Sequence, residues 1–153
     1  MNTGSSKTRV ISIIDDDPFV RQATDDLLRS LGYLTATFAS AEDFLQLSYI
    51  HETICLISDV QMPGLSGVDL QRLLIAEGNR MPTIFITAYF DERIRQSVME
   101  AGAIGYLGKP FDDESLIELL QWALGSEWTF ASRRGAVASR PAVPIKSINA
   151  SVT

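Results

Sequence analysis

The sequence predicts an α/β fold with a doubly wound parallel sheet, and two observations lead to this prediction. Short apolar runs rich in β-branched residues recur along the chain, and each precedes a longer segment whose apolar residues return every three or four positions. The runs are typical of buried strands, and the longer segments are typical of amphipathic helices. Five such pairs in strict alternation favour a parallel sheet with helices on both faces, because parallel strands need crossover connections.

The predicted strands are short and mostly apolar. VISII, for example, is too short for a helix and is rich in β-branched residues, as in a central strand. The five predicted strands cover residues 10–14, 33–38, 54–58, 83–87 and 103–107.

A helix is predicted after each strand. In the first, apolar residues recur at Val20, Ala23, Leu27, Leu28 and Leu31. Gly32 is the expected stop of this helix. The other helices are predicted to start at Ser40, to cover 66–77, to run from about Asp91 to Ala101, and to run from about Asp113 to Leu124.

Length and composition fit one soluble domain followed by a tail. The chain has 153 residues, and domains cluster near ~100–150 residues. It has no apolar stretch of the ~18 residues that a membrane helix needs and no signal-peptide pattern, so we expect a cytoplasmic protein that does not bind membranes. The single cysteine, Cys55, excludes an internal disulfide and a cysteine-rich metal site, and we expect it to be buried.

Charge and composition change near the end of the chain. We expect residues 1–8 to be disordered, 9–125 to form the folded domain, and 126–153 to be a flexible tail without a recognisable output domain. Residues 1–125 hold 9 Lys and Arg against 18 Asp and Glu, whereas 126–153 hold 4 against 1. Because the folded part is acidic and the tail only weakly basic, direct binding to nucleic acid is not expected.

Polar residues follow four of the predicted strands, at the edge where open α/β sheets bind their ligands. They are Asp15, Asp16 and Asp17, then Ser58 and Asp59, then Thr87, and finally Lys109. Asp17 precedes Pro18, so we explain it as the N-cap of the first helix. The carboxylates of Asp15, Asp16 and Asp59 should converge, and they need a counter-charge because like charges disfavour each other's ionisation. Oxygen-only ligands point to Mg²⁺, or to Mn²⁺ as a similar hard cation.

These groups suit a phosphoryl group bonded to the protein. Asp59 can act as a nucleophile that forms an acyl phosphate. The cation and Lys109 would neutralise charge on the phosphoryl oxygens, and Thr87 would add a hydroxyl donor. A single acidic residue after a strand is ordinarily a helix cap or a solvated charge, but four matching strand ends are hard to explain in this way.

The segments that carry these residues resemble the receiver domain of two-component response regulators. The resemblance runs from about Val10 to Leu124, and it is greatest to receivers of the FixJ and NarL type. It rests on IIDDD at 13–17, SDVQMPGLSGVDL at 58–70, ITA at 86–88 and AGAIGYLGKPF at 101–111. It implies a CheY-like, flavodoxin-like (βα)5 fold with strand order 2-1-3-4-5.

The resemblance also implies a role for each site residue. Asp59 would be the phosphoacceptor, and its donor would be a sensor histidine kinase or a histidine phosphotransfer protein. The metal ligands would be Asp16 and Asp59 directly, Asp15 largely through water, and the backbone carbonyl of Gln61. Tyr89, two residues after Thr87, stands at a place that tunes the lifetime of the acyl phosphate, and we hypothesise that it shields the phosphoryl group.

The resemblance further implies a switch. Thr87 and Lys109 would hold the phosphoryl oxygens, and Tyr106 would turn inward together with Thr87. The bond between Lys109 and Pro110 would be cis. The surface of the fourth helix, fifth strand and fifth helix would then change and signal to a downstream protein partner, with a homodimer formed on phosphorylation as a further expectation.

Other functions remain open beside this interpretation. A Mg²⁺-dependent aspartyl phosphatase usually needs a second acidic residue two positions after its nucleophile, where this chain has Gln61. A phosphorylation-independent interaction module is disfavoured by the intact Asp59, Thr87 and Lys109. The chain is also compatible with a fragment of a DNA-binding transcriptional regulator. We expect a signalling domain rather than an enzyme, with chemistry limited to self-catalysed phosphotransfer and autodephosphorylation.

Overall fold

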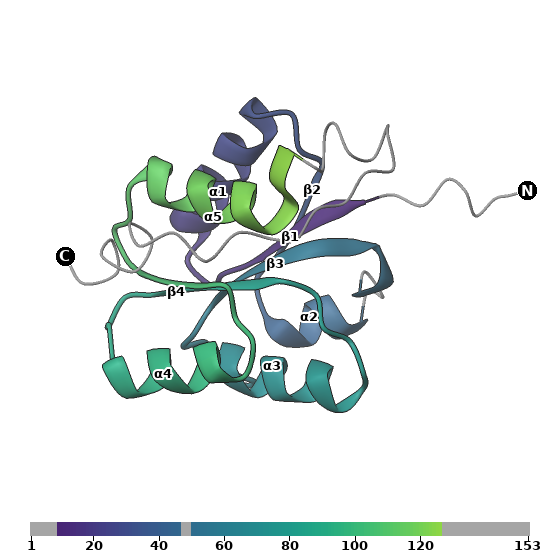
Figure 1. Cartoon of the computed structure of the whole chain (residues 1–153), viewed down its shortest axis with the longest axis vertical. Helices are drawn as coiled ribbons and strands as arrows, with labels where there is room; N and C mark the ends of the chain where they lie inside the picture. The colour runs from purple at the N-terminus through teal and green to yellow at the C-terminus, as the bar shows by residue number, and fades with distance from the viewer. Residues whose placement is uncertain (1–8, 47–49, 127–153) are drawn as a thin grey trace, which may run out of the picture. The chain divides into compact units, whose positions relative to one another are not determined.

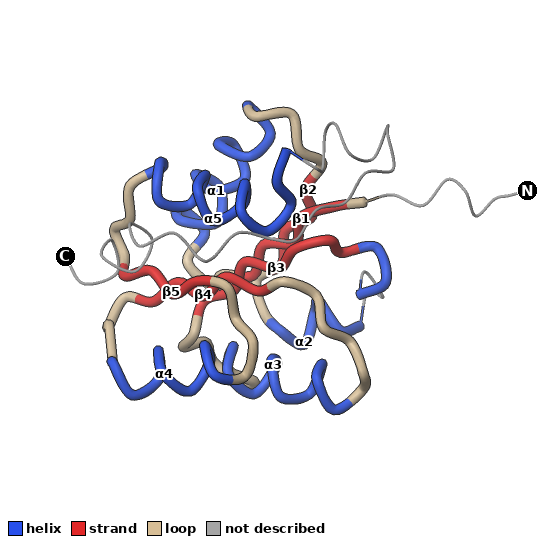
Figure 2. Tube along the Cα trace, viewed as in Figure 1, coloured by secondary structure: helices blue, strands red, loops and turns tan. Residues whose placement is uncertain are grey.

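The computed structural model describes residues 9–46 and 50–126, and these form one five-stranded sheet in the order β2-β1-β3-β4-β5 (Figures 1 and 2). The strands are β1 (Val10–Ile14), β2 (Thr35–Phe38), β3 (Thr53–Asp59), β4 (Thr83–Thr87) and β5 (Gly105–Gly108). The helices are α1 (Pro18–Ser30), α2 (Ala41–Gln46), the short 3-10 helix η2 (Ile50–Glu52), α3 (Gly67–Ala76), α4 (Glu92–Glu100) and α5 (Asp113–Ser126). The predicted doubly wound α/β fold and its strand order are confirmed.

The chain divides after Met81 into two compact units. In the first unit, β1 pairs in parallel with β2 and with β3, and α1 covers one face of these strands while α2 and α3 cover the other (Figure 2). In the second unit, β4 pairs in parallel with β5, and α4 and α5 lie on opposite faces of the two strands. Residues 1–8, expected to be disordered, and residues 127–153 of the expected tail at 126–153 lie outside the described residues, whereas Ser126 is the last residue of α5.

Two strands begin later than the sequence predicts, because the preceding residues end a helix. Gly32 has a φ of +94°, and the Tyr33 N–H donates to the Leu28 carbonyl over 3.1 Å, so the chain turns sharply after α1 before β2 starts. Likewise, the Ala103 N–H donates to the Val98 carbonyl over 2.9 Å at the end of α4. The prediction that β5 begins at residue 103 is therefore wrong by two residues.

The predicted apolar face of α1 is partly wrong. Only Thr24 and Leu28 of this helix are buried, whereas Ala23 and Leu31 are exposed. A buried threonine is tolerated because its hydroxyl donates to the Val20 carbonyl over 2.8 Å, which satisfies it within the helix.

The core of the first unit includes residues of β1 and β3, among them Ile14, the last residue of β1. Phe38 and Phe44 meet edge to face with ring centroids 5.4 Å apart, as aromatic pairs prefer. This hydrophobic core cluster comprises Ile14, Phe38, Ala41, Phe44, Leu56, Met62, Leu70 and Leu74. It holds α2 and α3 against the strands whose ends carry the acidic residues.

Cys55 is buried, as predicted. Within the described ranges, no helix combines the length and apolarity needed to cross a membrane.

Candidate functional site

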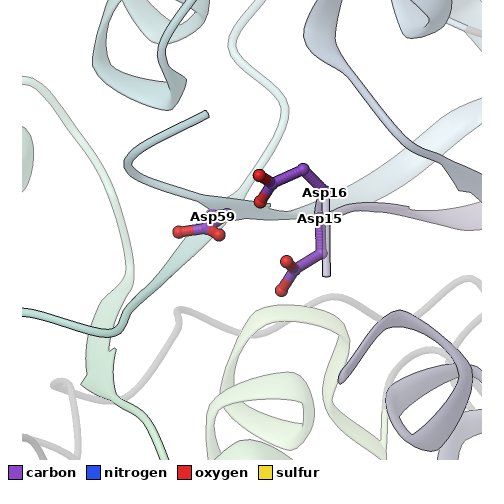
Figure 3. A group of neighbouring side chains, drawn as sticks. All are labelled: Asp15, Asp16 and Asp59. Carbon is purple, nitrogen blue, oxygen red and sulfur yellow. The ribbon is translucent and has the colours of Figure 1, made fainter. Parts of the chain in front are cut away.

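Three carboxylates meet at the ends of β1 and β3 (Figure 3). One oxygen each from Asp15, Asp16 and Asp59 lies within 4.8 Å of the other two. Asp15 and Asp59 are buried, whereas Asp16 is exposed and leaves the group open to solvent. The structure thus brings together the three acidic side chains that the sequence analysis expects to converge.

The chemistry of this acidic group suits a small, hard cation. Buried carboxylates of like charge are unfavourable unless a positive group or hydrogen bonds compensate them. All three side chains offer oxygen, which Mg²⁺ prefers, and the exposed Asp16 leaves room for the waters that Mg²⁺ usually keeps. The donor set therefore fits Mg²⁺, and Mn²⁺ accepts the same ligands.

Local hydrogen bonds hold the end of β1 in place. The Asp17 N–H donates to Asp15 Oδ1 over 2.9 Å, and Arg21 Nη1 donates to the Asp15 backbone carbonyl over 2.6 Å. Asp17 itself caps α1, because its Oδ1 accepts from the N–H groups of Phe19 and Val20. The predicted capping role of Asp17 is confirmed. Arg21 was not predicted, since one basic residue in an amphipathic helix forms no recognisable pattern.

Hydrogen bonds also hold the end of β3 and the loop that follows it in place. The Gln61 N–H donates to Asp59 Oδ1 over 3.3 Å, and the Ser58 hydroxyl donates to the Asp59 carbonyl over 2.9 Å. The Gly67 N–H donates to the Val60 carbonyl over 2.9 Å, which closes the loop between β3 and α3. A Cβ at Gly67 would overlap the Asp59 carbonyl oxygen, so only glycine allows this close approach.

In the second unit, Thr87 and Tyr106 lie beside the loop between β4 and α4. Thr87 Oγ1 accepts from the Tyr89 N–H over 3.1 Å, and the Tyr106 hydroxyl accepts from the Asp91 N–H over 3.4 Å. The Tyr106 ring is buried and meets Phe90 edge to face at 5.0 Å between centroids. Burial is the main cause that raises the pKa of Tyr106. The hydrogen bond with the Asp91 backbone opposes this rise, and the charge of Asp91 adds to it.

Lys109 follows β5 in this second unit. Its N–H donates to the Thr87 carbonyl over 2.7 Å, and the bond between Lys109 and Pro110 is cis, as the resemblance implies. Thr87 and Lys109 belong to the second unit, so their approach to Asp59 stays a prediction, as does the inward turn of Tyr106.

The chain matches the family model described as the response regulator receiver domain over residues 11–121. Nodulation protein W of Bradyrhizobium diazoefficiens is 33% identical over 96% of this chain and 63% of its own length. Response regulator protein TodT of Pseudomonas putida is 39% identical over 78% of this chain and 53% of its own length. Transcriptional regulatory protein FixJ of Azorhizobium caulinodans is 36% identical over 75% of this chain and 54% of its own length. The chain thus spans about half to two thirds of these relatives.

The chain is also similar to solved structures of response regulators and of receiver domains. Response regulator StyR has a TM-score of 0.71 at 36% identity, over 84% of this chain and 63% of that chain. A response regulator receiver protein from Burkholderia phymatum has a TM-score of 0.66 at 39% identity, over 77% of this chain and 96% of its own. The FixJ-N structure has a TM-score of 0.67 at 29% identity, over 91% of this chain and 100% of that chain.

Proposed function

The chain belongs to the response regulator receiver family of two-component systems, and we propose that Asp59 is its phosphoacceptor, with a sensor histidine kinase or a histidine phosphotransfer protein as donor. The convergence of Asp15, Asp16 and Asp59 on one point is the observation that carries the proposal. Domains of this family are signalling domains and not classical enzymes. A cytoplasmic location stays part of the proposal.

The metal-binding residues would be Asp16 and Asp59 directly, Asp15 largely through water, and Gln61 through its backbone carbonyl. Mg²⁺ or Mn²⁺, when bound, would neutralise charge on the phosphoryl oxygens and on the carboxylates. The oxygen-only donor set and the open side at Asp16 support this assignment.

In the transfer itself, one carboxylate oxygen of Asp59 would attack the phosphorus of a phosphohistidine. A P–O bond forms as the P–N bond breaks, and the bonding electron pair returns to the imidazole nitrogen. The Gln61 N–H orients the Asp59 carboxylate, and burial of Asp59 limits competing water. Thr87 and Lys109 would bind the phosphoryl oxygens, and the strand order, with β4 next to β3, supports this expectation.

The output would follow from a change in the position of Thr87 and Tyr106. As Thr87 moves toward the phosphoryl group, the surface of α4, β5 and α5 would change and alter affinity for a downstream protein partner or for a second copy of the chain. The contacts of Thr87 with Tyr89 and of Tyr106 with Asp91 support a mechanical link through the loop between β4 and α4.

A second candidate concerns the protein as a whole. The relatives FixJ and TdiR are named transcriptional regulatory proteins, and this chain spans 54% and 57% of their lengths. We therefore propose, as the second candidate, that this receiver is the regulatory part of a transcriptional regulator. Binding to DNA would then depend on sequence other than the described residues.

Incubation with acetyl phosphate and Mg²⁺, followed by intact mass measurement, tests the proposed phosphoacceptor. The wild type should gain the mass of one phosphoryl group, while Asp59→Asn and the wild type in EDTA should not. If the wild type gains no phosphoryl group, or if Asp59→Asn gains one as fast, the proposal is wrong. The first result would favour a phosphorylation-independent interaction module.

A further inference from the structure

Glu42, on α2, reaches across to the loop between β3 and α3, which comprises residues 60–66. Its Oε2 accepts a hydrogen bond from the Leu65 N–H over 2.8 Å, although the two residues are 23 positions apart in the sequence. Glu42 is exposed to solvent, which weakens the effect of its charge, so the contact matters mainly because it supplies an acceptor oxygen at a fixed place. The carboxylate of Glu42 thus ties the far end of this loop to α2.

Gly64 makes this contact possible. Its φ is +82°, in the left-handed region that favours glycine, and a Cβ there would lie 2.5 Å from Glu42 Oε2. The Glu42 carboxylate therefore rests directly against the Gly64 backbone. The conformation of the turn and the position of the carboxylate depend on each other.

The same helix also holds the middle of the loop through apolar packing. Met62 is 8% exposed and belongs to the core cluster that contains Phe44 of α2. The Gly67 N–H, bonded to the Val60 carbonyl, closes the base of the loop. Gln61 lies between these anchors, so the loop has little freedom to move it independently of α2.

Gln61 connects the loop to the acidic group. Its N–H donates to Asp59 Oδ1 over 3.3 Å, and its carbonyl is the backbone group that the proposed function assigns to the metal. A residue that orients a metal ligand influences affinity although it does not touch the metal. The path from α2 to Asp59 thus runs through Leu65 and Gln61.

We propose that Glu42 is a positioning residue for the phosphoacceptor site, an inference that rests on the proposed function. Its carboxylate holds the loop so that the Gln61 N–H and carbonyl stay aligned with Asp59 and with the bound cation. Without Glu42, the loop loses its polar anchor, and the Asp59 carboxylate and the Gln61 carbonyl are less well oriented for Mg²⁺.

Three variants separate positioning from a simple effect of charge. Glu42→Ala removes both the charge and the acceptor of the Leu65 N–H. Glu42→Gln removes the charge and keeps an acceptor oxygen. Asp43→Ala is the matched control, because Asp43 is the adjacent exposed carboxylate on α2 and its backbone N–H, not its side chain, bonds Ser40.

The Kd of Mg²⁺, measured by titration calorimetry, and the rate of phosphorylation by acetyl phosphate at saturating Mg²⁺ are the main readouts. Glu42→Ala should weaken Mg²⁺ binding about tenfold and slow phosphorylation, whereas Glu42→Gln and Asp43→Ala should stay within about twofold of the wild type. In ¹H–¹⁵N spectra, Glu42→Ala should shift the Gln61 and Leu65 amide signals, and Asp43→Ala should leave both unchanged. A merely structural role would lower Tm in Glu42→Ala without changing the Kd of Mg²⁺.

The inference is overturned if Glu42→Ala binds Mg²⁺ within twofold of the wild type, or if the Gln61 amide signal does not move. Equal weakening in Glu42→Ala, Glu42→Gln and Asp43→Ala would show an effect of charge alone and would also overturn it. Failure of the proposed function looks different, because the wild type itself would then gain no phosphoryl group, whatever Glu42 does.

Discussion

Arg21 shows how one side chain supports the acidic group without belonging to it. Its guanidinium donates to the Asp15 backbone carbonyl, so it helps to fix the turn from β1 into α1. A hydrogen bond from a charged donor is worth more than a neutral one, although partial exposure of Arg21 reduces its value.

Replacing Arg21 tests this support. Arg21→Ala should lower the free energy of unfolding by about 1 kcal/mol, as measured by urea denaturation, because the Asp15 carbonyl loses a charged donor. Arg93→Ala is the control, since the Arg93 side chain is 94% exposed and lies 4.0 Å from its acidic neighbour Asp91. Equal stability of Arg21→Ala and the wild type would show that the hydrogen bond is not stabilising.

Tyr106 gives a prediction about alkaline pH. Burial raises the pKa of its phenol above the ordinary value of 10.0, so the folded protein resists ionisation that the unfolded chain undergoes. The resulting stability is fully present below the pKa of the unfolded state and is lost as pH rises through the pKa of the folded state. Burial also raises the pKa of Tyr33.

Phenolate absorbance during an alkaline titration checks this prediction. The wild type should show a late-ionising fraction from Tyr33 and Tyr106, and Tyr106→Phe should lose part of it. The prediction fails if the late fraction is the same in the variant.

At the scale of single residues, the capping role of Asp17 could be predicted from the sequence, because it depends on adjacent residues. The role of Glu42 could not, because it depends on a contact with a residue 23 positions away.

At the scale of elements, strand ends and helix starts are packed tightly enough to restrict residue choice. The N-terminus of α3 approaches the end of β3 so closely that Gly67 has no room for a Cβ beside the Asp59 carbonyl. Ser66 caps this helix, since its hydroxyl accepts from the Asp69 N–H over 3.0 Å.

Gly67→Ala should therefore destabilise the protein. Alanine normally favours a helix over glycine by up to about 1 kcal/mol, but overpacking here should reverse the sign and cost about 1–3 kcal/mol. Thermal or urea unfolding measures the change. A variant as stable as the wild type, or more stable, would contradict the close approach of Gly67 and Asp59.

Element boundaries could be predicted where sequence signals are local. The strand at 10–14 and the strand at 83–87 agree with β1 and β4, because each is a short run rich in β-branched residues. The late start of β5 could not be predicted, since apolar Ala103 and Ile104 are indistinguishable by pattern from strand residues. The Ala103 N–H bonds instead to the Val98 carbonyl at the end of α4.

At the scale of the molecule, the site arises because two strands distant in sequence end side by side. The residues just after the predicted strands were enough to predict that Asp15, Asp16 and Asp59 converge, because β1 and β3 are parallel neighbours. The same reasoning predicts that Thr87 and Lys109 approach Asp59, but this part stays a prediction. It depends on how the unit that starts at Pro82 meets the first one.

Binding of a cation at the acidic group should stabilise the whole chain. Mg²⁺ at about 100 times its Kd should raise the free energy of unfolding by about 2.7 kcal/mol, through preferential binding to the folded state. Thermal unfolding with and without Mg²⁺ measures this as a rise in Tm that EDTA reverses. Asp16→Asn should reduce the rise, and Asp43→Asn, which changes an exposed carboxylate on α2, should not. Equal rises in all three proteins would place the cation elsewhere.

The identity of the phosphorylated residue is the most direct test of the central claim. After incubation with acetyl phosphate, borohydride reduces an aspartyl phosphate to homoserine, and peptide mapping by mass spectrometry then locates it. We predict homoserine at position 59 alone, formed with Mg²⁺ and absent in EDTA. Homoserine at another aspartate, or equal formation at position 59 without a divalent cation, would contradict the account.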